Sequence, residues 1–148
     1  MGLKSEEDFS NEQFHLLLEG LMRQWWFSKV YIFYFIEKLI KITSDVKFYI
    51  YGLDKVQQIC ADHYFKTISN AKMGLNLSRG EPIKYNSSDR ITQIIGNGLV
   101  TLIDEKTHYR DFFSDQEMVF YKNVSDLSEK ITKISKDEKL RKKIAKKG

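Results

Sequence analysis

Residues 76–104 place one short helical pattern between two short apolar runs, and this segment most constrains the fold. The pattern begins after a pair of serines at 87–88 and ends at the glycine-rich turn 96–98. Parallel α/β domains place such a helix between two strands and hold phosphate groups at its amino end. The segment therefore predicts both a fold class and a place to look for function.

Apolar runs and helical patterns alternate along most of the chain. The predicted strands are residues 46–51, 73–77, 99–103 and 118–121. Residues 54–70 are predicted to form a loop and a helix, with Tyr64, Phe65 and Ile68 facing inward, and the next helix is capped by Ser87 or Ser88. Residues 109–113 are predicted to form a short turn or helix. Residues 125–147 are predicted to be helical, with Ser125 as the cap, the apolar stripe Leu127, Ile131 and Ile134, and a second helix that begins at Asp137. This alternation predicts an α/β fold with a mostly parallel, doubly wound sheet.

The first 45 residues carry a different pattern. Residues 9–26 have the apolar spacing of a helix, and residues 30–42 read as a strand running into a helix, followed by a break at 43–45. The most apolar stretch, residues 25–36, is too short for the roughly twenty residues that span a bilayer. It indicates core packing or a surface that met another domain, with peripheral docking on a membrane as an alternative.

Composition sets the broad class of the protein. A chain of 148 residues with 42% hydrophobic residues suits one globular domain. Cys60 is the only cysteine, so no disulfide forms within the chain, and a reducing, cytoplasmic location is expected. The acidic and polar residues 1–11 do not resemble a signal peptide. Much of the net charge of +4 falls in the last dozen residues, as on a solvated helix end.

Two predicted loops follow directly on strands. Ser78 and Arg79 come after the strand 73–77, and Asp104 and Glu105 come after the strand 99–103. Open α/β sheets bind ligands beyond the carboxyl ends of their strands, so both loops are expected at one edge. The Asp104–Glu105 pair would either contact a hydroxyl group of a ligand at this edge or cap its loop.

The helix start between these loops has the groups that bind an anion. A diphosphate there would meet backbone N–H groups and cationic side chains together. The candidate residues are the backbone donors of Asp89 and Arg90, the hydroxyls of Ser87 and Ser88, and the cations Arg79, Lys84 and Arg90. In the alternative interpretation Ser88 and Asp89 only cap the helix, and the arginines are solvated or paired with Glu81 and Asp111.

The residues at this site resemble a known family. Three stretches are similar to the C-terminal half of GT-B glycosyltransferases. They are Asn76-Leu-Ser-Arg79, Ser87-Ser-Asp-Arg-Ile-Thr-Gln-Ile-Ile-Gly-Asn-Gly98 and Phe120-Tyr-Lys-Asn-Val-Ser-Asp-Leu127. Within that group they resemble the glycosyl transferases group 1 type and its spore-maturation-like branch. The resemblance runs from about residue 35 to residue 148.

This resemblance implies a three-layer, Rossmann-like domain that binds the nucleotide of a sugar donor. Arg90 stands where the family has an arginine at the helix start, and Gln93 stands where a family carboxylate holds the ribose hydroxyls. The Gln93 amide can donate one hydrogen bond and accept one, but it cannot act as a charged acceptor for both ribose hydroxyls. In the alternative interpretation, Gln93 is simply an exposed residue of the helix. A metal-independent transferase without a cofactor is implied, and the sequence has no Asp-x-Asp motif.

The resemblance also predicts the domain organisation. Residues 1–34 form an atypical, aromatic-rich segment, and residues 35–148 form a truncated donor-binding domain. In the family a second domain usually supplies the acceptor site and the base, so activity would need a partner chain or a homodimer. The other hypothesis is a non-catalytic α/β module that self-associates through its aromatic face. The sequence identifies no catalytic residue, metal ligand set or nucleic-acid-binding signature.

Overall fold

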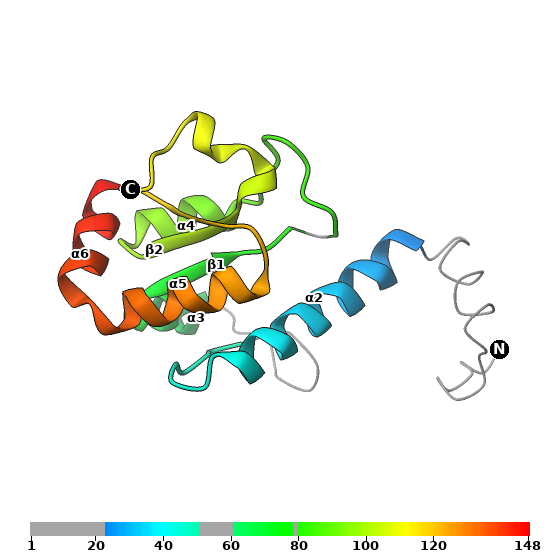
Figure 1. Ribbon diagram of the computed structural model, residues 1–148, viewed down its shortest axis with the longest axis horizontal. Coiled ribbons are helices and arrows are strands. Elements are labelled where there is room, and N and C mark those ends of the chain that lie inside the picture. Colours follow the sequence, from blue (N-terminus) through cyan, green and yellow to red (C-terminus); the bar gives the residue numbers. More distant parts are fainter. Residues whose placement is uncertain (1–22, 51–60, 79) are drawn as a thin grey trace.

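The computed structural model describes residues 23–50, 61–78 and 80–148 and has an α/β architecture (Figure 1). Its three-stranded sheet has the order β1-β2-β3, and both strand pairs are parallel. The strands are β1 (Met73–Asn76), β2 (Val100–Asp104) and β3 (Val119–Tyr121). The predicted fold class is therefore confirmed, and three of the predicted strands lie within a residue or two of their expected bounds.

The central strand β2 is buried on both faces. Residues 100–103 are all buried, and the flanking strands pair with β2 on either side. Because successive side chains of a strand point to opposite faces, Val100 and Leu102 serve one core and Ile103 serves another. A strand that is buried on both faces in this way requires helices on both faces of the sheet.

Three helices cover the face of Val100 and Leu102. They are α2 (Arg23–Ile42), α5 (Val124–Lys136) and α6 (Glu138–Lys147). Their buried residues that pack with this face are Leu39, Leu127, Ile131, Ile134 and Ile144. The predicted stripe along the helix after β3 is confirmed.

The helix α4 (Arg90–Gly96) covers the opposite face, where Ile91 packs with Ile103, Met118 and Phe120. The 3-10 helices η2 (Glu105–Thr107) and η3 (Tyr109–Asp111) connect β2 to β3. The helix α3 (Ala61–Asn70) precedes β1. The domain thus has three layers, with the sheet in the middle (Figure 1).

Side-chain caps fix the start of the last two helices. Asn123, rather than the predicted Ser125, begins α5, because its side chain accepts a hydrogen bond from the Asp126 N–H at 2.9 Å. Asp137 begins α6 as predicted and accepts from the Leu140 N–H at 2.9 Å.

Several predictions for the N-terminal half are wrong. Residues 30–42 are helical throughout, because Phe35 and Leu39, one turn apart, face the core that contains Tyr121. Residues 46–50 form no strand, although Val46 and Phe48 still pack against that core. Phe65 does not face inward as predicted, since it is 62% exposed.

Other predictions fall partly or wholly on residues that are not described. Most of the predicted helix 9–26 and the position of Cys60 lie outside the described residues. Within the described ranges, no helix combines the length and the apolar character needed to cross a bilayer.

Gly74 lies in close contact with α4, and a larger residue at this position should therefore destabilise the fold. A Cβ at Gly74 would lie 2.6 to 2.8 Å from three side-chain carbons of Ile94, whereas a Cβ at Gly96 would meet nothing within 4 Å. We expect Gly74→Ala to lower the free energy of unfolding by about 1 to 3 kcal/mol through overpacking. Gly96→Ala, the matched control, should be neutral or stabilising by up to about 1 kcal/mol. Urea denaturation measures both, and equal effects of the two variants would contradict the packing argument.

Candidate functional site at the carboxyl edge of the sheet

The three parallel strands end at one edge of the sheet with different side chains. Asn76 ends β1, Asp104 ends β2 and Tyr121 ends β3. Asn76 pairs with Ile103, and Asp104 pairs with Tyr121. The expectation that the loops after β1 and β2 lie at the same edge is therefore confirmed for Ser78, Asp104 and Glu105, while Arg79 lies outside the described residues.

Asn76 ties both serines to the end of β1. Its amide Nδ2 donates to Ser87 Oγ at 2.6 Å, and its Oδ1 accepts from Ser88 Oγ at 3.3 Å. The residue at the N-cap of α4 is Asp89, which makes no side-chain capping bond. The prediction that Ser87 or Ser88 caps this helix is thus wrong, because the buried Asn76 amide uses these hydroxyls for its own hydrogen bonds.

Arg90 and Gln93 share an exposed face of α4. They are three residues apart on the helix, and both are exposed. The Gln93 side-chain oxygen accepts a hydrogen bond from the Tyr64 hydroxyl of α3. Arg90 forms no ion pair within the described part of the chain, so the alternative pairing with Glu81 or Asp111 is not found there.

Tyr85 anchors the loop between β1 and α4. Its N–H donates to the Thr107 carbonyl at 2.8 Å, and its hydroxyl donates to Asp111 Oδ2 at 2.6 Å. The backbone of Tyr85 has a positive φ of 59°, a conformation that bulky residues adopt only when their surroundings hold it. The Lys84 ammonium lies 4.7 Å from the centre of the Tyr85 ring. The candidate cation Lys84 is therefore carried by a loop that is fixed to η2 and η3.

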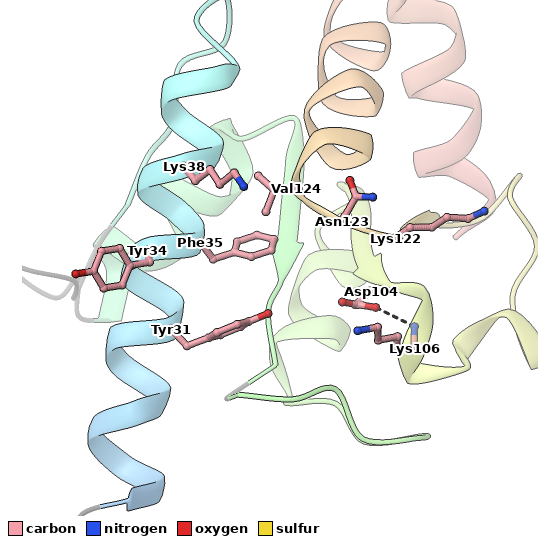
Figure 2. Close-up of a pocket in the computed structure, with 9 residues that line it drawn as sticks. All are labelled: Tyr31, Tyr34, Phe35, Lys38, Asp104, Lys106, Lys122, Asn123 and Val124. Carbon is pink, nitrogen blue, oxygen red and sulfur yellow. Dashed lines mark hydrogen bonds between the residues drawn. The ribbon is translucent and has the colours of Figure 1, made fainter. Parts of the chain in front are cut away.

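A pocket of about 350 Å³ lies at the same edge, between α2 and the ends of β2 and β3 (Figure 2). Its volume falls within the range of about 300 to 1,000 Å³ that is typical of ligand sites. The lining residues are Tyr31, Tyr34, Phe35, Lys38, Asp104, Lys106, Lys122, Asn123 and Val124. Aromatic residues of α2 form one wall, and polar and charged residues of the sheet edge form the other.

Asp104 is the only acidic residue among those that line the pocket. Its Oδ1 accepts the Lys106 N–H at 2.9 Å, which caps η2. Burial raises the pKa of the Asp104 carboxyl above its usual value and outweighs the Lys106 N–H and the Lys106 charge, which lower it. Burial also raises the pKa of the Tyr121 hydroxyl, and the charge of Asp104 adds to this effect.

Sequence reasoning missed this pocket because α2 supplies one of its walls. From the sequence, the aromatic block is expected in the core, at a surface that met another domain or on a membrane surface, and no local pattern indicates which sheet edge α2 approaches. The Asn123 cap has a local signal, since an asparagine three residues before Asp126 is typical of a helix start. Over the described ranges, no group of three or more His, Cys, Asp or Glu side chains could hold a metal ion.

Comparison with known protein families gives a match over most of the chain. A family model described as glycosyl transferase-like matches residues 33–148, which is more than three quarters of the chain. The matched region includes the sheet, α4 and all the residues that line the pocket except Tyr31. No curated protein and no solved structure matches.

Two carboxylates with opposite pKa shifts predict opposite pH effects on stability. The pKa of Asp104 is raised, so its ionisation costs stability as the pH rises above about 4, and Asp104→Asn removes this cost while keeping the cap. The pKa of Glu117 is lowered because it accepts the Ser114 N–H and hydroxyl, both at 2.8 Å. Glu117 therefore contributes stability above its unfolded pKa, and this is lost as the pH falls.

We expect Asp104→Asn to be more stable than the wild type at pH 7 and Glu117→Gln to be less stable. Both differences should shrink as the pH falls and the two carboxyls become protonated. Thermal unfolding between pH 3 and pH 8 measures them. If both variants were more stable than the wild type at pH 7, or both less stable, the opposite pKa shifts of Asp104 and Glu117 would be contradicted.

Proposed function

The chain belongs to the glycosyl transferase-like family, and we propose that its carboxyl-edge site binds the nucleotide of an activated sugar donor. The single observation that carries the proposal is the exposed face of α4. There Arg90 and Gln93 stand one turn apart, beside two serines that Asn76 holds against β1. The proposed reaction is transfer of the sugar to an acceptor hydroxyl.

The cations at this edge suit the diphosphate of the donor. Arg90 is exposed and has a guanidinium that can make paired hydrogen bonds to phosphate oxygens. Lys84 adds a second positive charge from the neighbouring loop, and the hydroxyls of Ser87 and Ser88 add polar contacts. When the bond to the sugar breaks, negative charge develops on the leaving diphosphate, and these cations would stabilise it without a metal ion.

Gln93 suits one hydroxyl of the donor ribose. Its side-chain oxygen already accepts from Tyr64, which leaves the amide N–H groups as donors toward a ligand. A neutral amide binds a hydroxyl less strongly than a carboxylate does. In this proposal most of the affinity comes from the diphosphate, and residues 35–148 form the donor-binding domain of a cytoplasmic protein.

Calorimetric titration with nucleoside diphosphates and nucleotide sugars tests the proposal. We expect Arg90→Ala to weaken binding by about tenfold to a hundredfold, the cost of a charged hydrogen bond. Arg141→Ala is the matched control, because α6 contacts the segment before β3, at the opposite edge of the sheet. Absence of heat with every nucleotide, or equal loss in both variants, would overturn the proposal.

A non-catalytic module that self-associates is the second candidate. One observation favours it: Phe33, Tyr34, Ile40 and Ile42 of α2 are all more than a third exposed. A second copy could cover this apolar surface. Light scattering at micromolar concentration should then give twice the mass of the chain, and Tyr34→Glu should give the monomer. A monomeric wild type would exclude this candidate.

A further inference from the structure

A hydrogen bond between α3 and α4 fixes the side chain of Gln93. The Tyr64 hydroxyl donates to the Gln93 side-chain oxygen, and the two positions are 29 residues apart in the sequence. Tyr64 is half-buried, whereas Gln93 is exposed. Within the described residues, the Gln93 amide nitrogen donates to no protein acceptor. The protein therefore holds the oxygen of this amide, and the N–H groups remain for a ligand.

This hydrogen bond makes Gln93 chemically different from a carboxylate at the same position. A carboxylate has two charged oxygens and can accept from both hydroxyls of a ribose. The Gln93 amide has one neutral oxygen, and the Tyr64 hydroxyl already occupies one of its acceptor positions. The amide N–H groups, in contrast, bind only to an oxygen that accepts a hydrogen bond.

We infer that Tyr64 is a positioning residue of the donor site and that the site binds 2′-deoxyribonucleotides as readily as ribonucleotides. The inference rests on the proposed function, because it needs the sugar of the nucleotide to lie against Gln93. One amide N–H group contacts one hydroxyl oxygen, and a 2′-deoxyribose still has its 3′-hydroxyl. Loss of the 2′-hydroxyl therefore removes no contact with Gln93. The substrate class includes the diphosphate sugars of deoxyribonucleosides.

The spacing on α4 allows one nucleotide to reach both of the residues that it needs. Arg90 and Gln93 stand three residues apart, which places their Cβ atoms about 5 to 6 Å from each other on a helix. The ribose of a nucleoside diphosphate is bonded directly to the diphosphate. The phosphates can therefore lie at Arg90 while the sugar lies at Gln93.

The Tyr64 hydroxyl sets the direction of the amide and not the position of the helix. The helix α4 is held by its buried residues Ile91 and Ile94. A glutamine side chain has several rotatable bonds, so an exposed one samples many orientations in the free protein. The hydrogen bond from Tyr64 selects one of these orientations before a ligand binds, and binding then loses less side-chain entropy.

Matched pairs of nucleotides test the substrate class. Calorimetric titration compares UDP with dUDP and GDP with dGDP, so that the members of each pair differ only in the 2′-hydroxyl. For the wild type, we expect the two Kd values of a pair to agree within about threefold. Gln93→Glu supplies a free carboxylate oxygen and should make the ribonucleotide at least about tenfold tighter, as expected for a hydrogen bond to a charged acceptor. Gln116→Glu, an exposed position before β3, is the control for the added charge and should leave the ratio unchanged.

A double-mutant cycle tests the role of Tyr64. Tyr64→Phe removes only the hydroxyl and should weaken binding of both members of a pair by about threefold, because the amide is no longer held. In a Gln93→Ala background the same change should have no effect, since Tyr64 acts only through Gln93. Tyr49→Phe, at an exposed tyrosine on the segment after α2, is the matched control.

The outcomes separate this inference from the proposed function. A wild type that binds ribonucleotides more than about threefold more tightly than deoxyribonucleotides would overturn the inference, and so would Gln93→Glu with no gain in preference. A Tyr64→Phe effect that persists in the Gln93→Ala background would also overturn it, because the hydroxyl would then act independently of Gln93. In each of these cases the diphosphate site itself would stand. Absence of binding with every nucleotide would instead contradict the proposed function.

Discussion

Burial of β2 on both faces is the constraint on which the rest of this domain depends. The backbone of β2 is paired with a parallel strand on each side, and its side chains at 100 to 103 are removed from water. Helices must therefore cover both faces, and parallel pairing requires each connection to cross from one edge to the other. The connection from β1 to β2 uses α4, and the connection from β2 to β3 uses two short 3-10 helices. Both pack on one face, which leaves the other face to α2, α5 and α6.

The same pairing explains why polar residues gather at one edge. A side chain at the carboxyl end of a parallel strand does not need to be apolar, because the helices do not cover the sheet beyond this edge. Asn76 uses this position to fix two serines by hydrogen bonds, whereas Asp104 uses it to cap η2 with one oxygen. Two neighbouring strand ends thus have different roles: the first organises a loop, and the second leaves part of a carboxylate facing a pocket.

The parts of the fold that the sequence predicts are those with local signals. Three apolar runs flanked by turn residues became strands, and the stripe Leu127, Ile131 and Ile134 became the buried side of α5. The wrong predictions come from competition at long range. The run 30–34 is rich in β-branched and aromatic residues, but Phe35 and Leu39 pack on the sheet only as one face of a helix. The serines at 87 and 88 suit a cap, but Asn76, more than ten residues away, takes their hydrogen bonds. Neither outcome can be read from a short window of sequence.

The packing of α2 also decides how rigid the pocket is. Leu39 is buried in the core, and Thr43, just after the helix, donates to the Ser128 hydroxyl at 2.6 Å in a buried hydrogen bond. Ser128 belongs to α5, whose first turn begins beside the opposite wall of the pocket at Asn123. The aromatic wall and the sheet edge are therefore both joined to α5, so the packing of two helices sets the width of the pocket. A site supported in this way is preorganised, because a ligand does not have to order either wall when it binds.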